Sequence, residues 1–139
     1  MAVKRRDVRE SALILTFEKL FRDDSLDEIF ETALESEEVV VNDEVKTLVN
    51  GIIDKTEELD GIISKYSNKR AVERIPKINL AILRLAIYEA NYDDKVPINV
   101  AISEAVALAK KYAQEADISF VNGVLGSYSR SEEAPENNE

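Results

Sequence analysis

The sequence contains no cysteine and no histidine among its 139 residues. Without thiols or imidazoles it cannot form disulfides, a thiolate nucleophile, a zinc finger or a Ser-His-Asp triad. It also lacks a phosphate-binding P-loop and a GxGxxG dinucleotide motif. We therefore expect a binding protein and not an enzyme, with no catalytic residues, no metal site and no cofactor.

Helix breakers are also scarce, with four glycines and three prolines. No apolar run approaches the roughly 18 residues that a membrane span needs. The basic N-terminal stretch is not followed by the apolar region of a signal peptide. These absences predict a cytoplasmic protein that does not associate with a membrane.

The formal charge of −10 is unevenly distributed along the chain. Residues 23–44 carry ten acids and no base, and residues 131–139 carry four acids and no base. The rest of the chain has 14 acids and 18 bases, a net charge of +4. The overall acidity therefore does not exclude nucleic-acid binding by the remainder.

Apolar residues recur at three- and four-residue spacings almost throughout, which is typical of helices. Helices are predicted over about 5–21, 25–34, 42–66, 78–92, 97–112 and from 117 or 119 to 128. The segment 67–77 reads as a loop with one helical turn. The pattern predicts an all-α, compact single-domain bundle of six to seven helices arranged as two three-helix subdomains. We assign the domain to residues 1–130 and a disordered acidic tail to residues 131–139.

Two basic clusters are candidates for binding nucleic acid. The first consists of Lys4, Arg5, Arg6 and Arg9 at the start of a helix, whose N-terminal dipole also favours anions. The second consists of Lys65, Lys69, Arg70, Arg74 and Lys77, among which Lys69 and Arg70 are the candidates for RNA contact. Taken alone, each cluster is also typical of an ordinary solvated helix end or loop. Phe17, two turns beyond Arg9, either stacks on an unpaired base or packs in the core.

Five stretches in order resemble the NusB family of bacterial transcription antitermination factors. They are RRDVRESAL at 5–13, ILRLAIYE at 82–89, PINVAISEAV at 97–106, AKKY at 109–112 and FVNGVL at 120–125. Each motif alone is weak, but the ordered set is specific and extends over nearly the whole chain.

The resemblance implies a partner set and contact residues. It implies binding to the boxA element of ribosomal RNA leader transcripts together with NusE, a small-subunit ribosomal protein. Other Nus factors and RNA polymerase would then be engaged indirectly. Lys4, Arg5, Arg6 and Arg9 match the family's RNA-binding arginine motif, and Phe17 replaces a tyrosine of many members. Glu89, Asp117 and Phe120 are predicted to face NusE, although Glu89 pairing with Arg84 and Phe120 in the core are the structural alternatives.

Two other hypotheses stay open from the sequence. One is an RNA-targeting helical module related to the N-terminal domain of ribosomal RNA cytosine methyltransferases. The other is a protein-interaction bundle without antitermination activity. Family members differ in oligomeric state, so a monomer and a homodimer are both compatible with the sequence.

Overall fold

The computed structural model describes residues 3–68 and 70–133. Within these ranges the fold is all-α, as predicted, with seven α-helices, one 3₁₀ turn and no strand. The helices are α1 (Arg5–Lys19), α2 (Leu26–Ala33), α3 (Asp43–Asp54), α4 (Thr56–Tyr66), α5 (Lys77–Tyr92), α6 (Ile98–Tyr112) and α7 (Glu115–Glu133). The 3₁₀ turn, Val72–Arg74, confirms the single helical turn expected between residues 67 and 77.

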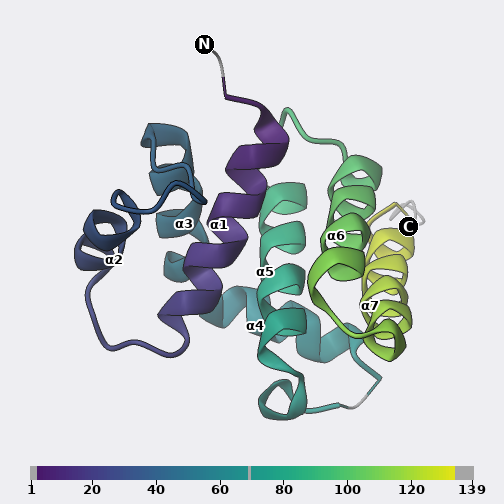
Figure 1. The fold of residues 1–139 in the computed structure, drawn as a ribbon. Helices are drawn as coiled ribbons and strands as arrows, with labels where there is room; N and C mark the ends of the chain where they lie inside the picture. Colours follow the sequence, from purple (N-terminus) through teal and green to yellow (C-terminus); the bar gives the residue numbers. More distant parts are fainter. Residues whose placement is uncertain (1–2, 69, 134–139) are drawn as a thin grey trace. The chain divides into compact units, whose positions relative to one another are not determined.

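The chain forms two compact units, and the first extends from Met1 to Thr56. In this unit α1 packs against α3 and also contacts α2 (Figure 1). Apolar side chains at helical spacing fill its core: Val8, Ala12, Leu13, Leu15, Ile29, Phe30, Val45, Leu48, Val49 and Ile52. Burial of this apolar surface is the main stabilising contribution to so small a unit.

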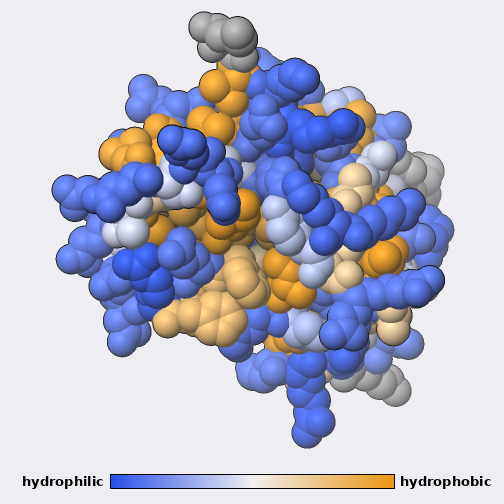
Figure 2. All heavy atoms as spheres, viewed as in Figure 1, coloured by the Kyte–Doolittle hydropathy of each residue, from blue (hydrophilic) through white to orange (hydrophobic). Residues whose placement is uncertain are grey.

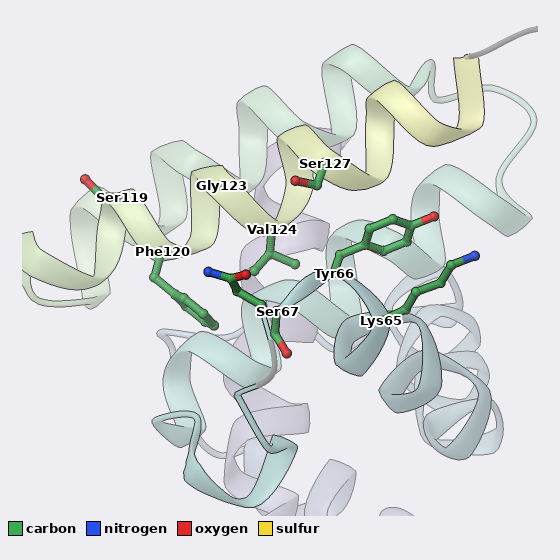
Figure 3. Close-up of a pocket in the computed structure, with 9 residues that line it drawn as sticks. Lys65, Tyr66, Ser67, Ser119, Phe120, Gly123, Val124 and Ser127 are labelled. Carbon is green, nitrogen blue, oxygen red and sulfur yellow. The ribbon is translucent and has the colours of Figure 1, made fainter.

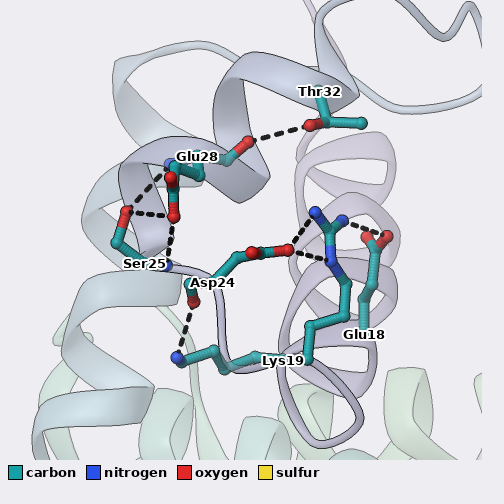
Figure 4. A network of polar contacts seen from close by, with 7 residues as sticks. Glu18, Lys19, Asp24, Ser25, Glu28 and Thr32 are labelled. Atoms are coloured by element: carbon teal, nitrogen blue, oxygen red, sulfur yellow. Dashed lines mark hydrogen bonds and ion pairs between the residues drawn. The ribbon is translucent and has the colours of Figure 1, made fainter.

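Polar contacts fix the start of α2 against the end of α1 (Figure 4). Ser25 and Glu28 form a capping box, in which each side chain accepts a hydrogen bond from the other residue's backbone N–H. Arg22 forms ion pairs with Glu18 on α1 and with Asp24 in the connecting loop. The Lys19 ammonium donates to the Asp24 carbonyl at 2.8 Å. The connection between α1 and α2 is thus held by side chains as well as by packing.

The second unit extends from Glu57 to Glu139, and α5 is its central helix. Helix α5 packs against α6 and α7, which also pack against each other (Figure 1). Every residue from Asn79 to Ile87 is buried, as the apolar pattern of this helix predicts. Arg84 on α5 forms a bidentate ion pair with Asp60 on α4, which attaches α4 to the central helix.

The structure corrects three predicted helix boundaries. The predicted helix over 42–66 is two helices, because α3 ends at Asp54 and α4 begins at Thr56. The Thr56 hydroxyl donates to the Ile52 carbonyl at 3.0 Å across the junction of the two helices. Helix α1 ends at Lys19 and not at residue 21. Helix α7 reaches Glu133, so residues 131–133 of the predicted tail are helical, and 134–139 lie outside the described residues.

Figure 2 shows hydrophilic side chains over most of the face in view, with apolar side chains in separate patches. In the described ranges, none of the helices combines the length and apolar character needed to cross a membrane.

Candidate nucleic-acid interface

The start of α1 presents two exposed cations. Lys4 is the N-cap residue, and its side chain makes no capping hydrogen bond. The side chains of Lys4 and Arg6 are both exposed. The unpaired backbone N–H groups of a first helical turn carry partial positive charge, so these two side chains reinforce an existing preference for anions.

The other two arginines of this cluster lie differently. Arg5 is half-buried and forms an ion pair with Glu44 in the first turn of α3. Arg9 is only 5% exposed and is one of the buried charged residues. The contacts of Arg5 and Arg9 with RNA stay predictions, and Arg9 would have to leave its buried position to reach a phosphate. The spacing of Arg9 to Ala12, Leu13 and Thr16 on the buried face was the signal for this burial.

Phe17 is neither fully exposed for stacking on a base nor fully buried in the core, the two alternatives that the sequence left open. Its side chain is half-buried, and its ring packs edge-on against Phe21 with centroids 5.0 Å apart. Phe21 is 60% exposed. The end of α1 and the turn that follows it therefore carry an aromatic pair, with the Phe21 ring open to solvent. The stacking of Phe17 on RNA stays a prediction.

The second unit holds a cation-aromatic pair. The guanidinium carbon of Arg70 lies 4.7 Å from the centroid of the Phe120 ring, within the range of a cation-π interaction. Arg70 precedes the 3₁₀ turn and Phe120 lies on α7, so folding brings together a predicted RNA contact and a predicted partner contact. Lys69, the neighbouring RNA-binding candidate, lies outside the described residues.

A cavity of about 480 Å³ opens beside Phe120. Figure 3 shows Phe120 and Val124 projecting from α7 toward the end of α4, where Tyr66 and Ser67 lie. The other lining residues are Lys65, Asn68, Ser119, Gly123 and Ser127. Asn68 has a φ of 58°, a left-handed conformation that asparagine tolerates better than most residues. The cavity combines an aromatic wall with hydroxyl and amide groups, a lining suited to a planar polar ligand.

Two further candidates for partner binding differ in accessibility. Asp117 is half-buried in the first turn of α7. Glu89 on α5 is fully buried. The expected pairing partner of Glu89, Arg84, binds Asp60 through two hydrogen bonds of 2.8 Å. The roles of Asp117, Glu89 and Phe120 in binding a partner stay predictions.

Sequence reasoning did not single out Glu44 or the residues from Tyr66 to Asn68. The pairing of Arg5 with Glu44 joins positions 39 apart in the chain, so no local pattern signals it. An asparagine after a predicted helix was the available sign of a turn at Asn68.

These features define a class: all-helical proteins whose basic helix start and cation-aromatic surface suit nucleic acid. Residues 4–130 match the sequence profile of the NusB family, and the chain belongs to that family.

Named relatives agree with the fold and with the family. The transcription antitermination protein NusB of Ruminiclostridium cellulolyticum is 41% identical over 128 residues, which cover 91% of this chain and 88% of that protein. The structure of NusB from T. maritima aligns with a TM-score of 0.83 at 31% identity, covering 94% of this chain and 93% of that one. A NusB chain crystallised with NusE and double-stranded RNA aligns with a TM-score of 0.79 at 27% identity, covering 91% and 96%.

Proposed function

We propose that this member of the NusB family is a cytoplasmic transcription antitermination factor that binds boxA-type RNA together with NusE. The observation that carries the proposal is the pair of exposed cations, Lys4 and Arg6, at the N-terminus of α1. Antitermination relatives support it, as does the related NusB chain bound to NusE and RNA. The protein acts by binding and not by catalysis.

The affinity for RNA comes first from phosphate contacts. Lys4 and Arg6 neutralise backbone phosphates, and the released counterions make binding dependent on salt. Phosphate contacts position the RNA but do not read its sequence. Sequence preference then requires unpaired bases, for which the Phe17 and Phe120 rings are the aromatic candidates.

NusE binding is assigned to the second unit. Phe120 borders a cavity with hydroxyl-bearing residues, and Asp117 lies one turn before it on α7. These two side chains are at least partly accessible, whereas Glu89 is fully buried. A role for Glu89 is therefore the support of α5 behind the contact surface and not direct contact.

The test measures RNA binding by fluorescence anisotropy across a salt series, with NusE present. The probes are a labelled single-stranded boxA RNA and the same sequence as a duplex. Replacing both Lys4 and Arg6 by alanine is expected to weaken binding about tenfold or more at low salt. The slope of log K against log salt is expected to fall by about 1.4, since each single-strand phosphate contact contributes about 0.7.

The matched control is Arg130→Ala, which removes an exposed arginine from α7 in the second unit. It is expected to leave the slope unchanged. Absence of RNA binding by the wild-type protein with NusE present would refute the proposal. A flat salt dependence together with no RNA shift would favour a pure protein-interaction bundle.

A further inference from the structure

Glu44, an acid on α3, is paired with Arg5 of the basic cluster at the start of α1. The Arg5 guanidinium donates to the Glu44 carboxylate. Arg5 is the first residue of α1, and Glu44 lies in the first turn of α3. Their side chains are 33% and 48% exposed, so the pair is accessible from solvent. Glu44 is also the last acid of the 23–44 segment, which carries no base.

The position of Glu44 is fixed by the local structure of α3. The Asn42 side chain caps this helix by accepting a hydrogen bond from the Val45 N–H at 2.8 Å. Acids in a first turn are stabilised by the helix dipole. Glu44 is therefore held at a well-defined helix start while it reaches toward Arg5, so the pair is more than a chance encounter of two mobile side chains.

A carboxylate and a phosphate compete for the same donors. Both present oxygens that match the planar fork of a guanidinium, and arginine binds either one. A phosphate that approaches Arg5 must displace the carboxylate or accept its repulsion. Partly exposed ion pairs contribute little free energy, so an RNA phosphate can displace the carboxylate from Arg5.

We propose that Glu44 is an internal competitor of RNA: it occupies Arg5 in the free protein and sets the affinity of α1 for a phosphate. The inference rests on the proposed function. Glu44, a residue of the acidic segment, would then have a specific role: an RNA phosphate must displace its carboxylate in order to bind Arg5. Affinity then depends on whether the ligand brings a phosphate to Arg5.

The experiment compares Glu44→Gln with wild type, using the labelled single-stranded boxA RNA and NusE. The expected result is two- to fivefold tighter binding at low salt, the size of effect expected for a surface ion pair. The gain is expected to shrink as salt rises, because screening weakens both the pair and the repulsion of phosphate by Glu44. Thermal unfolding by circular dichroism establishes that the variant is folded.

Two further variants separate pairing from a general charge effect. Asp43→Asn removes the same charge from the same helical turn and is expected to change affinity less than Glu44→Gln. In an Arg5→Ala background, Glu44→Gln is expected to give no gain beyond that of Asp43→Asn. Equal gains from the two acid variants, or a full gain without Arg5, would overturn the inference. If the wild-type protein binds the RNA and Glu44→Gln leaves the affinity unchanged, only this inference fails. If the wild-type protein does not bind the RNA, the proposed function fails as well.

Discussion

Arg84 on α5 and Asp60 on α4 form a bidentate ion pair, with both hydrogen bonds at 2.8 Å. Arg84 is 9% exposed in the central helix, whereas the Asp60 side chain is 26% exposed. A buried guanidinium without its carboxylate is costly because its charge loses compensation in a medium of low polarity. Asp60 on α4 therefore stabilises the packing of α4 against α5 by compensating the charge of Arg84.

Asp60→Asn is expected to lower the free energy of unfolding by about 1–3 kcal/mol, less than for a fully buried pair because Asp60 keeps some solvent contact. Urea unfolding followed by circular dichroism measures it. Glu57→Gln, an exposed change on the same helix, is the control and is expected to cost little. Replacing the pair together, as Arg84→Met with Asp60→Leu, is expected to recover part of the loss. A cost for Asp60→Asn no larger than that of the control would contradict this role.

Asn79 on α5 is fully buried, and its side-chain oxygen and nitrogen have no hydrogen-bond partner among the described residues. An unsatisfied buried amide costs about 1–3 kcal/mol relative to a satisfied one. Asn79→Leu, which keeps the number of side-chain heavy atoms, is therefore expected to raise the free energy of unfolding by about 1 kcal/mol. Asn79→Asp is the contrasting variant, since a buried charge should destabilise the protein. A loss of stability in Asn79→Leu as large as that in Asn79→Asp would contradict this expectation.

The Tyr92 hydroxyl donates to the Glu58 carboxylate at 2.6 Å. This hydrogen bond, followed by burial and the charge of Glu58, raises the pKa of Tyr92 above its ordinary value of 10.0. The contribution of the hydrogen bond to stability is therefore fully present below pH 10.0 and is lost as the pH rises through the higher folded pKa. Glu58→Gln is expected to lower the pKa of Tyr92, as measured by ultraviolet titration of phenolate. Subtracting the titration of Tyr92→Phe identifies the signal, and a Tyr92 pKa at or below 10.0 in the wild type would be the contrary result.

The helices were predictable from the sequence because their apolar spacing and caps are local properties. The Ser25–Glu28 capping box and the buried face of α5 follow directly from neighbouring residues. The break between α3 and α4 was missed, since neither glycine nor proline lies at residues 54–56 to mark it. The local sequence pattern thus predicts which segments are helical, but it does not predict every break between two consecutive helices.

The site was predictable as residue types but not as contacts. The basic start of α1 was identified correctly as a cluster, yet its four cations differ in exposure because α3 and the core lie on one side of the helix. Pairing of Arg5 with Glu44 and of Arg70 with Phe120 joins distant segments, which only the tertiary structure brings together.

The Arg70–Phe120 pair links a predicted RNA contact to a predicted NusE contact, so their contributions to binding are expected to be interdependent. Arg70→Ala and Phe120→Leu are each expected to weaken assembly with NusE and boxA RNA. Because each variant removes the contact that orients the other side chain for binding, the combined loss should be smaller than the sum of the two single losses. Isothermal titration of the four proteins measures this coupling. Arg74→Ala combined with Phe120→Leu is the matched control, since Arg74 is an exposed cation of the same basic cluster and its effect should add. Additive losses for Arg70 and Phe120 would mean that the two residues act on RNA and NusE independently.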